Sequence, residues 1–110
     1  MKQSRAVLSL SITLAVFAFP LLSHAEDSMA VQLQLSTLLA AESQCGMTYD
    51  QNAIQQFIDK KVSADDLDFA SSLALMSRGQ QAQVEQMSDS GKFAFCAQQR
   101  RVAKKLNFVQ

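Results

Sequence analysis

The sequence predicts an all-α fold, a small bundle of four to five short helices stapled by one disulfide. Three observations lead to this prediction. Apolar residues recur in several segments at the three-and-four spacing of an amphipathic helix. Asp, Ser and Gly residues stand at the ends of these segments, where helix caps are expected. The chain also contains two cysteines, and no segment alternates in the manner of a β-strand strongly enough to displace the helical prediction.

The first 25 residues have the features of a secretory signal peptide. Lys2 and Arg5 precede an apolar run over residues 6–22, and the small-residue segment 23–25 follows it. Ser, Thr and Pro dilute the run, which favours cleavage after residue 25 over an uncleaved membrane anchor. We therefore expect residues 26–110 to form one domain in the periplasm or outside the cell, without stable membrane insertion.

Charge and histidine content exclude several classes of function. Without Lys2 and Arg5, eight of the ten basic residues remain against ten acidic ones, a net charge of −2, whereas nucleic-acid-binding domains are usually strongly basic. The only histidine, His24, lies in the predicted signal peptide. The remaining domain therefore has no Ser-His-Asp triad, no Cys-His pair and no histidine metal ligand. We expect no catalytic residue, no metal site and no cofactor.

The first two helices are bounded by recognisable caps. The spacing predicts a helix over residues 29–45, with Gly46 as the left-handed residue that ends it. Asp50 is expected to cap a second helix over residues 51–61, with the preceding Tyr49 packing on Ile54. The apolar side of this second helix consists of Ile54, Phe57, Ile58 and Val62, and its last turn carries Lys60 and Lys61.

A third helix is expected to begin after Ser63. Ser63 is the predicted cap, and Asp65, Asp66 and Asp68 would lie in the first turns, where negative charge is favourable. This role accounts for the acidic group without a cation site, because no EF-hand spacing accompanies it. The inward side would include Leu67, Phe69, Ala70, Leu73, Ala74 and Met76.

Glycine at position 79 interrupts this pattern, because glycine in a helix interior costs about 1 kcal/mol relative to alanine. The sequence therefore predicts an end near Arg78 or a weakened junction. We expect a continuing or restarted helix over residues 80–87, with Val84 and Met87 on its inner side.

The last helix follows Ser88 or Ser90, either of which is a suitable cap. Its apolar side is predicted to hold Phe95, Val102, Leu106 and Val109, flanked by Cys96 and Ala103. Four basic residues project elsewhere, namely Arg100, Arg101, Lys104 and Lys105. They admit two interpretations: a docking patch for an anionic partner, such as an acidic protein or a phospholipid surface, or the more common solvated helix end stabilised by its dipole.

The two cysteines, Cys45 and Cys96, are expected to form a structural disulfide. An exported chain meets an oxidising compartment, and the spacing is not that of a CxxC redox or metal motif. A loop of this length contributes about 4 kcal/mol in the chain-entropy model. The bond requires the end of the first helix to lie beside the start of the last helix, with Cα atoms about 5.5 Å apart.

Short motifs around both cysteines carry a resemblance. At Cys45-Gly46-Met47, at Tyr49-Asp50 and at Lys92-x-Ala94-x-Cys96-Ala97-Gln98-x-Arg100-Arg101-Val102-Ala103-Lys104, the chain resembles a family of small exported two-cysteine proteins of alphaproteobacteria, which has no established activity. In export, size, helicity and cysteine number it also resembles the periplasmic acid-stress chaperones. That second resemblance matches no motif and implies no site residue.

The sequence favours a non-enzymatic binding or accessory protein whose partner is another protein of the bacterial envelope. An envelope chaperone that responds to acid stress is the alternative, and an inhibitor of a secreted toxin also fits the size and export signal. The sequence leaves the oligomeric state and the identity of the partner open.

Overall fold

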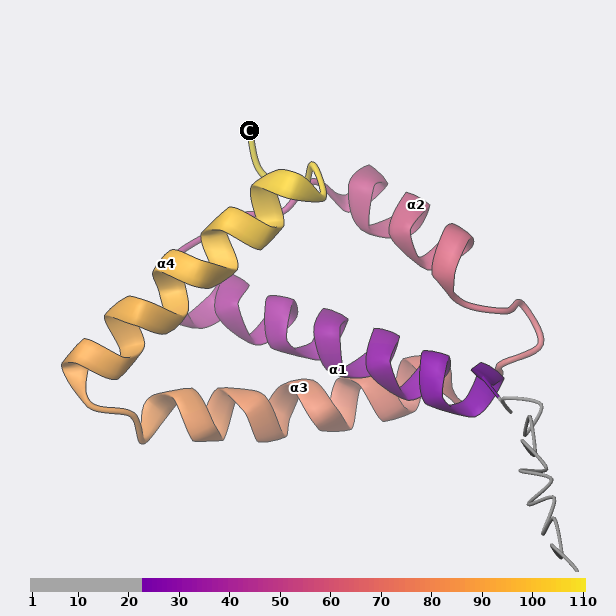
Figure 1. Cartoon of the computed structure of the whole chain (residues 1–110), viewed down its shortest axis with the longest axis horizontal. Coiled ribbons are helices and arrows are strands. Elements are labelled where there is room, and N and C mark those ends of the chain that lie inside the picture. Colours follow the sequence, from indigo (N-terminus) through magenta and orange to yellow (C-terminus); the bar gives the residue numbers. More distant parts are fainter. Residues whose placement is uncertain (1–22) are drawn as a thin grey trace, which may run out of the picture.

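The computed structural model describes residues 23–110, which form four α-helices and no strand (Figure 1). The helices are α1 (Ser23–Gln44), α2 (Gln51–Lys61), α3 (Phe69–Glu85) and α4 (Asp89–Lys105). The predicted all-α class is confirmed. Most of the predicted signal peptide, up to residue 22, lies outside the described residues, so its cleavage stays a prediction.

The four helices make a loosely triangular arrangement in which α1 is the central member. α1 and α3 pack along each other and run in the same direction, and α2, which follows α1 in the sequence, leads the chain back toward the start of α3 (Figure 1). α4 then rises obliquely from the end of α3 and packs against α1. The Cys45–Cys96 disulfide joins the end of α1 to the first half of α4, with Cα atoms 5.5 Å apart. The predicted disulfide is therefore confirmed.

Side-chain caps start α2 and α4. The Asp50 carboxylate accepts from the backbone N–H of Asn52 at 2.9 Å and of Ala53 at 3.4 Å, which confirms the predicted cap and the bounds of α2. For α4 the structure selects Ser88 rather than Ser90, because the Ser88 hydroxyl accepts from the Gly91 N–H at 3.1 Å.

The expected start of the third helix is wrong by about a turn and a half. The Ser63 hydroxyl accepts from the Asp65 N–H at 3.2 Å, but this bond closes a local turn and α3 begins only at Phe69. Serine side chains compete with helix formation in this way. The three aspartates therefore precede the helix, and Asp66 instead accepts from the Ser28 hydroxyl of α1 at 3.1 Å. Leu67, expected inside, is 88% exposed.

α3 runs without a break through Gly79 and ends at Glu85. A Cβ at Gly79 would meet nothing within 4 Å, so the glycine is not needed for a close approach. The packing of α3 along α1 offsets its low helix propensity. Val84 is buried as expected, whereas Met87 lies beyond the helix and is exposed, which corrects the prediction for that residue.

The buried core is centred on three aromatic rings. Phe108 lies between Tyr49 and Phe57, with ring centroids 5.4 Å and 5.8 Å away respectively. The Tyr49 hydroxyl donates to the Leu38 carbonyl at 2.7 Å, which satisfies its polar atom inside the core. Ile54 packs against this cluster. Four further buried residues complete it, namely Leu35, Leu38, Phe69 and Ala103.

The position of Phe108 was not predicted from the sequence, because the helical pattern was continued to Val109. α4 ends at Lys105, and Asn107 adopts a left-handed conformation with φ 61°. The Phe108 N–H then donates to the Ala103 carbonyl at 2.8 Å, and the Asn107 N–H to the Lys104 carbonyl at 3.1 Å. These two bonds define a Schellman motif. The reversal turns Phe108 back into the core.

Candidate docking surface on α4

The four basic residues predicted as a patch lie together on the exposed side of α4. Arg100, Arg101, Lys104 and Lys105 are all exposed, whereas Ala103 between them is fully buried. At about 100° per residue, the four positions span roughly 140° of the helix surface, opposite the side that packs on α1. We call this surface the α4 cationic face.

A phenylalanine that was not singled out from the sequence extends this face. Phe93 is 78% exposed and lies seven residues before Arg100, which places it on the same side of the helix about 10 Å away along the axis. Ala97 stands between them at helical spacing. Positions 93, 97, 100 and 104 follow the helical repeat, so the sequence already indicated that Phe93 and the basic residues share one side of the helix. An apolar residue at helical spacing more often packs in the core, which is why Phe93 was not singled out.

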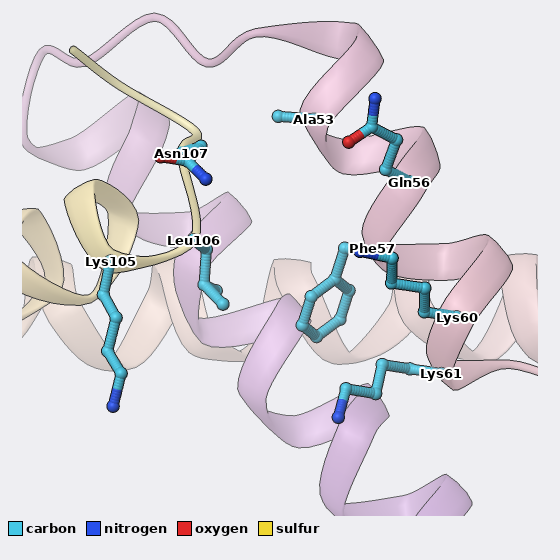
Figure 2. A pocket seen from close by; sticks show the side chains of 8 residues that line it. All are labelled: Ala53, Gln56, Phe57, Lys60, Lys61, Lys105, Leu106 and Asn107. Carbon is cyan, nitrogen blue, oxygen red and sulfur yellow. The ribbon is translucent and has the colours of Figure 1, made fainter.

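Lys105 also borders a pocket of about 230 Å³ between α2 and the end of α4 (Figure 2). Lys60 and Lys61 border it from α2, and the lining also includes Phe57 and Leu106. From the sequence, the two α2 lysines were predicted only as part of a helix end. No sequence spacing reveals that they line the same pocket as Lys105, because that pocket arises from the packing of the Phe108 segment beside α2.

The phenol of Tyr49 has a clearly perturbed pKa. Burial, and secondarily the Glu42 carboxylate, raise its pKa from 10.0 to about 12. The Glu42 carboxylate accepts from the Tyr49 backbone N–H at 2.6 Å, and the phenol donates to Leu38. The phenol therefore remains neutral at ordinary pH and has a structural role.

The described residues hold no group of three or more His, Cys, Asp or Glu side chains placed to bind a metal ion. Both cysteines are in the disulfide, which leaves no free thiol. Within residues 23–110, no helix combines the length and the apolar character that a membrane span requires.

Comparison of the chain with models of protein families, with curated proteins and with solved structures finds no match. The resemblance to small exported two-cysteine proteins therefore stays a prediction.

Proposed function

We propose that this protein is a non-enzymatic accessory protein of the bacterial envelope that docks an acidic partner protein through the α4 cationic face. The observation that carries the proposal is the placement of Phe93 in line with Arg100, Arg101, Lys104 and Lys105 on the side of α4 opposite the core. The disulfide supports an oxidising compartment as the place of action.

The two kinds of residue on this face have complementary uses in binding. Exposed basic residues attract an acidic surface and accelerate encounter, but each contributes little affinity at the rim of an interface. An aromatic side chain that enters an apolar pocket on the partner contributes much more, and aromatic residues and arginine are the commonest energetic centres of interfaces. Phe93 supplies such an anchor beside the two arginines.

A protein partner fits this face better than a lipid bilayer. Helices that lie in a membrane surface bury a broad apolar side, whereas the exposed side of α4 offers one large apolar residue, Phe93, and small alanines such as Ala94 and Ala97. A single exposed phenylalanine ring fits a pocket on a folded partner protein better than it fits a bilayer.

The test is retention of an envelope protein by the immobilised, disulfide-intact protein at low and high salt. We expect one dominant acidic partner, held at low salt and released as salt rises, because exposed charges are screened. Phe93→Ala should weaken its binding at least about thirtyfold, the effect of losing a binding anchor worth 2 kcal/mol. Arg100→Gln with Arg101→Gln should weaken binding and flatten its salt dependence.

The matched control is Lys60→Gln with Lys61→Gln, which removes the same charge from α2 and should leave partner binding unchanged. If the Phe93 and arginine variants retain the partner as well as the unmodified protein does, the α4 cationic face is only a solvated helix side.

A further inference from the structure

The loop between α2 and α3 combines an exposed leucine with acidic residues. Leu67 is 88% exposed, and the neighbouring Asp65 and Asp68 are exposed as well. We call residues 62–68 the acidic loop. Its surface is unlike that of the α4 cationic face in charge, but both carry one large apolar side chain in solvent.

Hydrogen bonds within the loop and to α1 hold Leu67 in this position. The Asp66 N–H donates to the Ser63 carbonyl at 3.1 Å, and the Leu67 N–H donates to the Asp65 carbonyl at 3.0 Å. The Asp66 carboxylate accepts from the Ser28 hydroxyl of α1. The loop is therefore already ordered, and a partner that docks on it loses little free energy in ordering it.

A hollow of about 440 Å³ lies beside Leu67, between the end of α2 and the start of α3. Its apolar lining includes Ile58 and Phe69, and Asp59 and Asp66 line it as well. Among the described residues that line this hollow, none is a lysine or arginine. Its matching ligand is therefore an apolar group accompanied by positive charge.

The α4 cationic face has this combination of properties. Phe93 is 78% exposed and lies on the same side of α4 as Arg100 and Arg101, about 10 Å from Arg100 along the helix axis. A second copy of the chain thus offers the acidic loop an aromatic ring for the hollow and guanidinium groups for the aspartates.

The acidic loop and the α4 cationic face lie too far apart to meet within one molecule. The loop precedes the start of α3, and α4 begins after the other end of α3 (Figure 1). α3 contains 17 residues and is therefore about 25 Å long. Contact between the two surfaces requires two copies.

We propose that the acidic loop of one copy docks on the α4 cationic face of a second copy, with Phe93 in the hollow beside Leu67. The contact joins two different surfaces, so each pair keeps one free loop and one free cationic face, and association continues into a chain or closes into a ring. Because it uses the α4 cationic face, this self-association rests on the function proposed above.

The first experiment is sedimentation velocity of the disulfide-intact protein over a range of concentrations. The sedimentation coefficient should rise with concentration at low salt and rise less at high salt, because exposed charges are screened. Leu67→Ala and Phe93→Ala should each weaken self-association at least about fivefold, as expected when an apolar contact is lost. The matched control is Leu75→Ala, since Leu75 is also exposed, at 71%, but does not line the hollow. This control should leave self-association unchanged.

A mixing experiment tests the pairing of unlike surfaces. Asp65→Asn with Asp68→Asn alters only the acidic loop, and Arg100→Gln with Arg101→Gln alters only the cationic face. Each double variant alone should self-associate at least about fivefold more weakly. An equal mixture should form a 1:1 dimer and nothing larger, because one intact loop and one intact face remain between the two variants. Larger assemblies in the mixture, or no dimer, would overturn the proposal.

The remaining outcomes separate self-association from the docking of another protein. A protein that stays monomeric at all concentrations but still retains an acidic envelope protein refutes self-association and leaves the proposed function standing. Neither self-association nor retention refutes both. Equal losses in the Leu67 and Leu75 variants would place the contact elsewhere and overturn the proposal. Unchanged far-UV dichroism and the absence of free thiols verify the fold of each variant.

Discussion

The ends of α1 and α4 use the same backbone motif for opposite purposes. At the end of α1, Gly46 is left-handed with φ 66°, and the Met47 N–H donates to the Glu42 carbonyl at 3.0 Å. At the end of α4, Asn107 has φ 61°, and the Phe108 N–H donates to the Ala103 carbonyl. At the first end the disulfide lies just before the reversal, at Cys45, whereas at the second the ring of Phe108 lies just after the reversal and enters the core.

The difference teaches that a left-handed residue sets the direction of the chain, whereas a neighbouring side chain, Cys45 before the first turn and Phe108 after the second, determines which contact holds that end. The Asp50 N–H donates to the Phe108 carbonyl at 2.8 Å, so the two reversals meet at the start of α2. α4 is thus held near its middle by a disulfide and at its C-terminal end by packing, and three measurements test that division.

Removal of the ring at the second reversal should have the largest effect. Phe108 is 1% exposed and contacts both Tyr49 and Phe57. Phe108→Ala should lower the free energy of unfolding by about 3 to 5 kcal/mol, because it leaves a cavity in a small core. Urea denaturation measures this. A loss below about 1 kcal/mol would show that the C-terminal segment does not belong to the cooperative core.

Removal of the covalent bond at the first reversal should cost a similar or slightly smaller amount. Cys96→Ser should lower stability by about 2 to 4 kcal/mol, because the bond closes the chain across a separation of 51 residues. Thiol titration of the denatured, unreduced protein should find no free thiol before the substitution and one afterwards. Two reactive thiols in the unmodified protein would contradict the disulfide itself.

The two left-handed residues should respond differently to substitution. Gly46→Ala should cost about 1 kcal/mol from backbone strain alone, since a Cβ there would meet nothing within 4 Å. Asn107→Gly should change stability by only a few tenths of a kcal/mol, because asparagine already tolerates this conformation. Thermal unfolding of both variants compares them. Equal losses at the two positions would mean that side-chain contacts, rather than backbone conformation, determine these ends.

Local signals in the sequence were sufficient for much of the fold. Asp50 and Gly46 mark helix ends through their own hydrogen-bonding and conformational chemistry, and the predicted export of a chain with two cysteines implied the Cys45–Cys96 bond. Local signals gave a wrong helix start where two local structures compete, as at Ser63, whose hydroxyl closes a turn instead of capping a helix. They also failed at Phe108, because a left-handed asparagine is far less specific a signal than a glycine.

Of the two candidate sites, the α4 cationic face could be predicted from the sequence and the pocket between α2 and the end of α4 could not. The four basic residues of α4 lie on one helix, so their common side follows from the helical repeat, and Phe93 was within reach of the same reasoning. The pocket between α2 and the end of α4 was not, since Lys60 and Lys61 line the same pocket as Lys105 only through tertiary packing. Sequence periodicity reports what one helix presents, but it carries no information on which helix ends become neighbours.

The disulfide has a topological consequence for proteolysis of the chain. Residues 46–95, including α2 and α3, form a closed ring between Cys45 and Cys96. A single proteolytic cut in the loops at residues 62–68 or 86–88 would therefore yield two peptides that remain linked as one molecule. The α4 cationic face would stay attached to α1 after such a nick, and only reduction of the bond would separate the pieces.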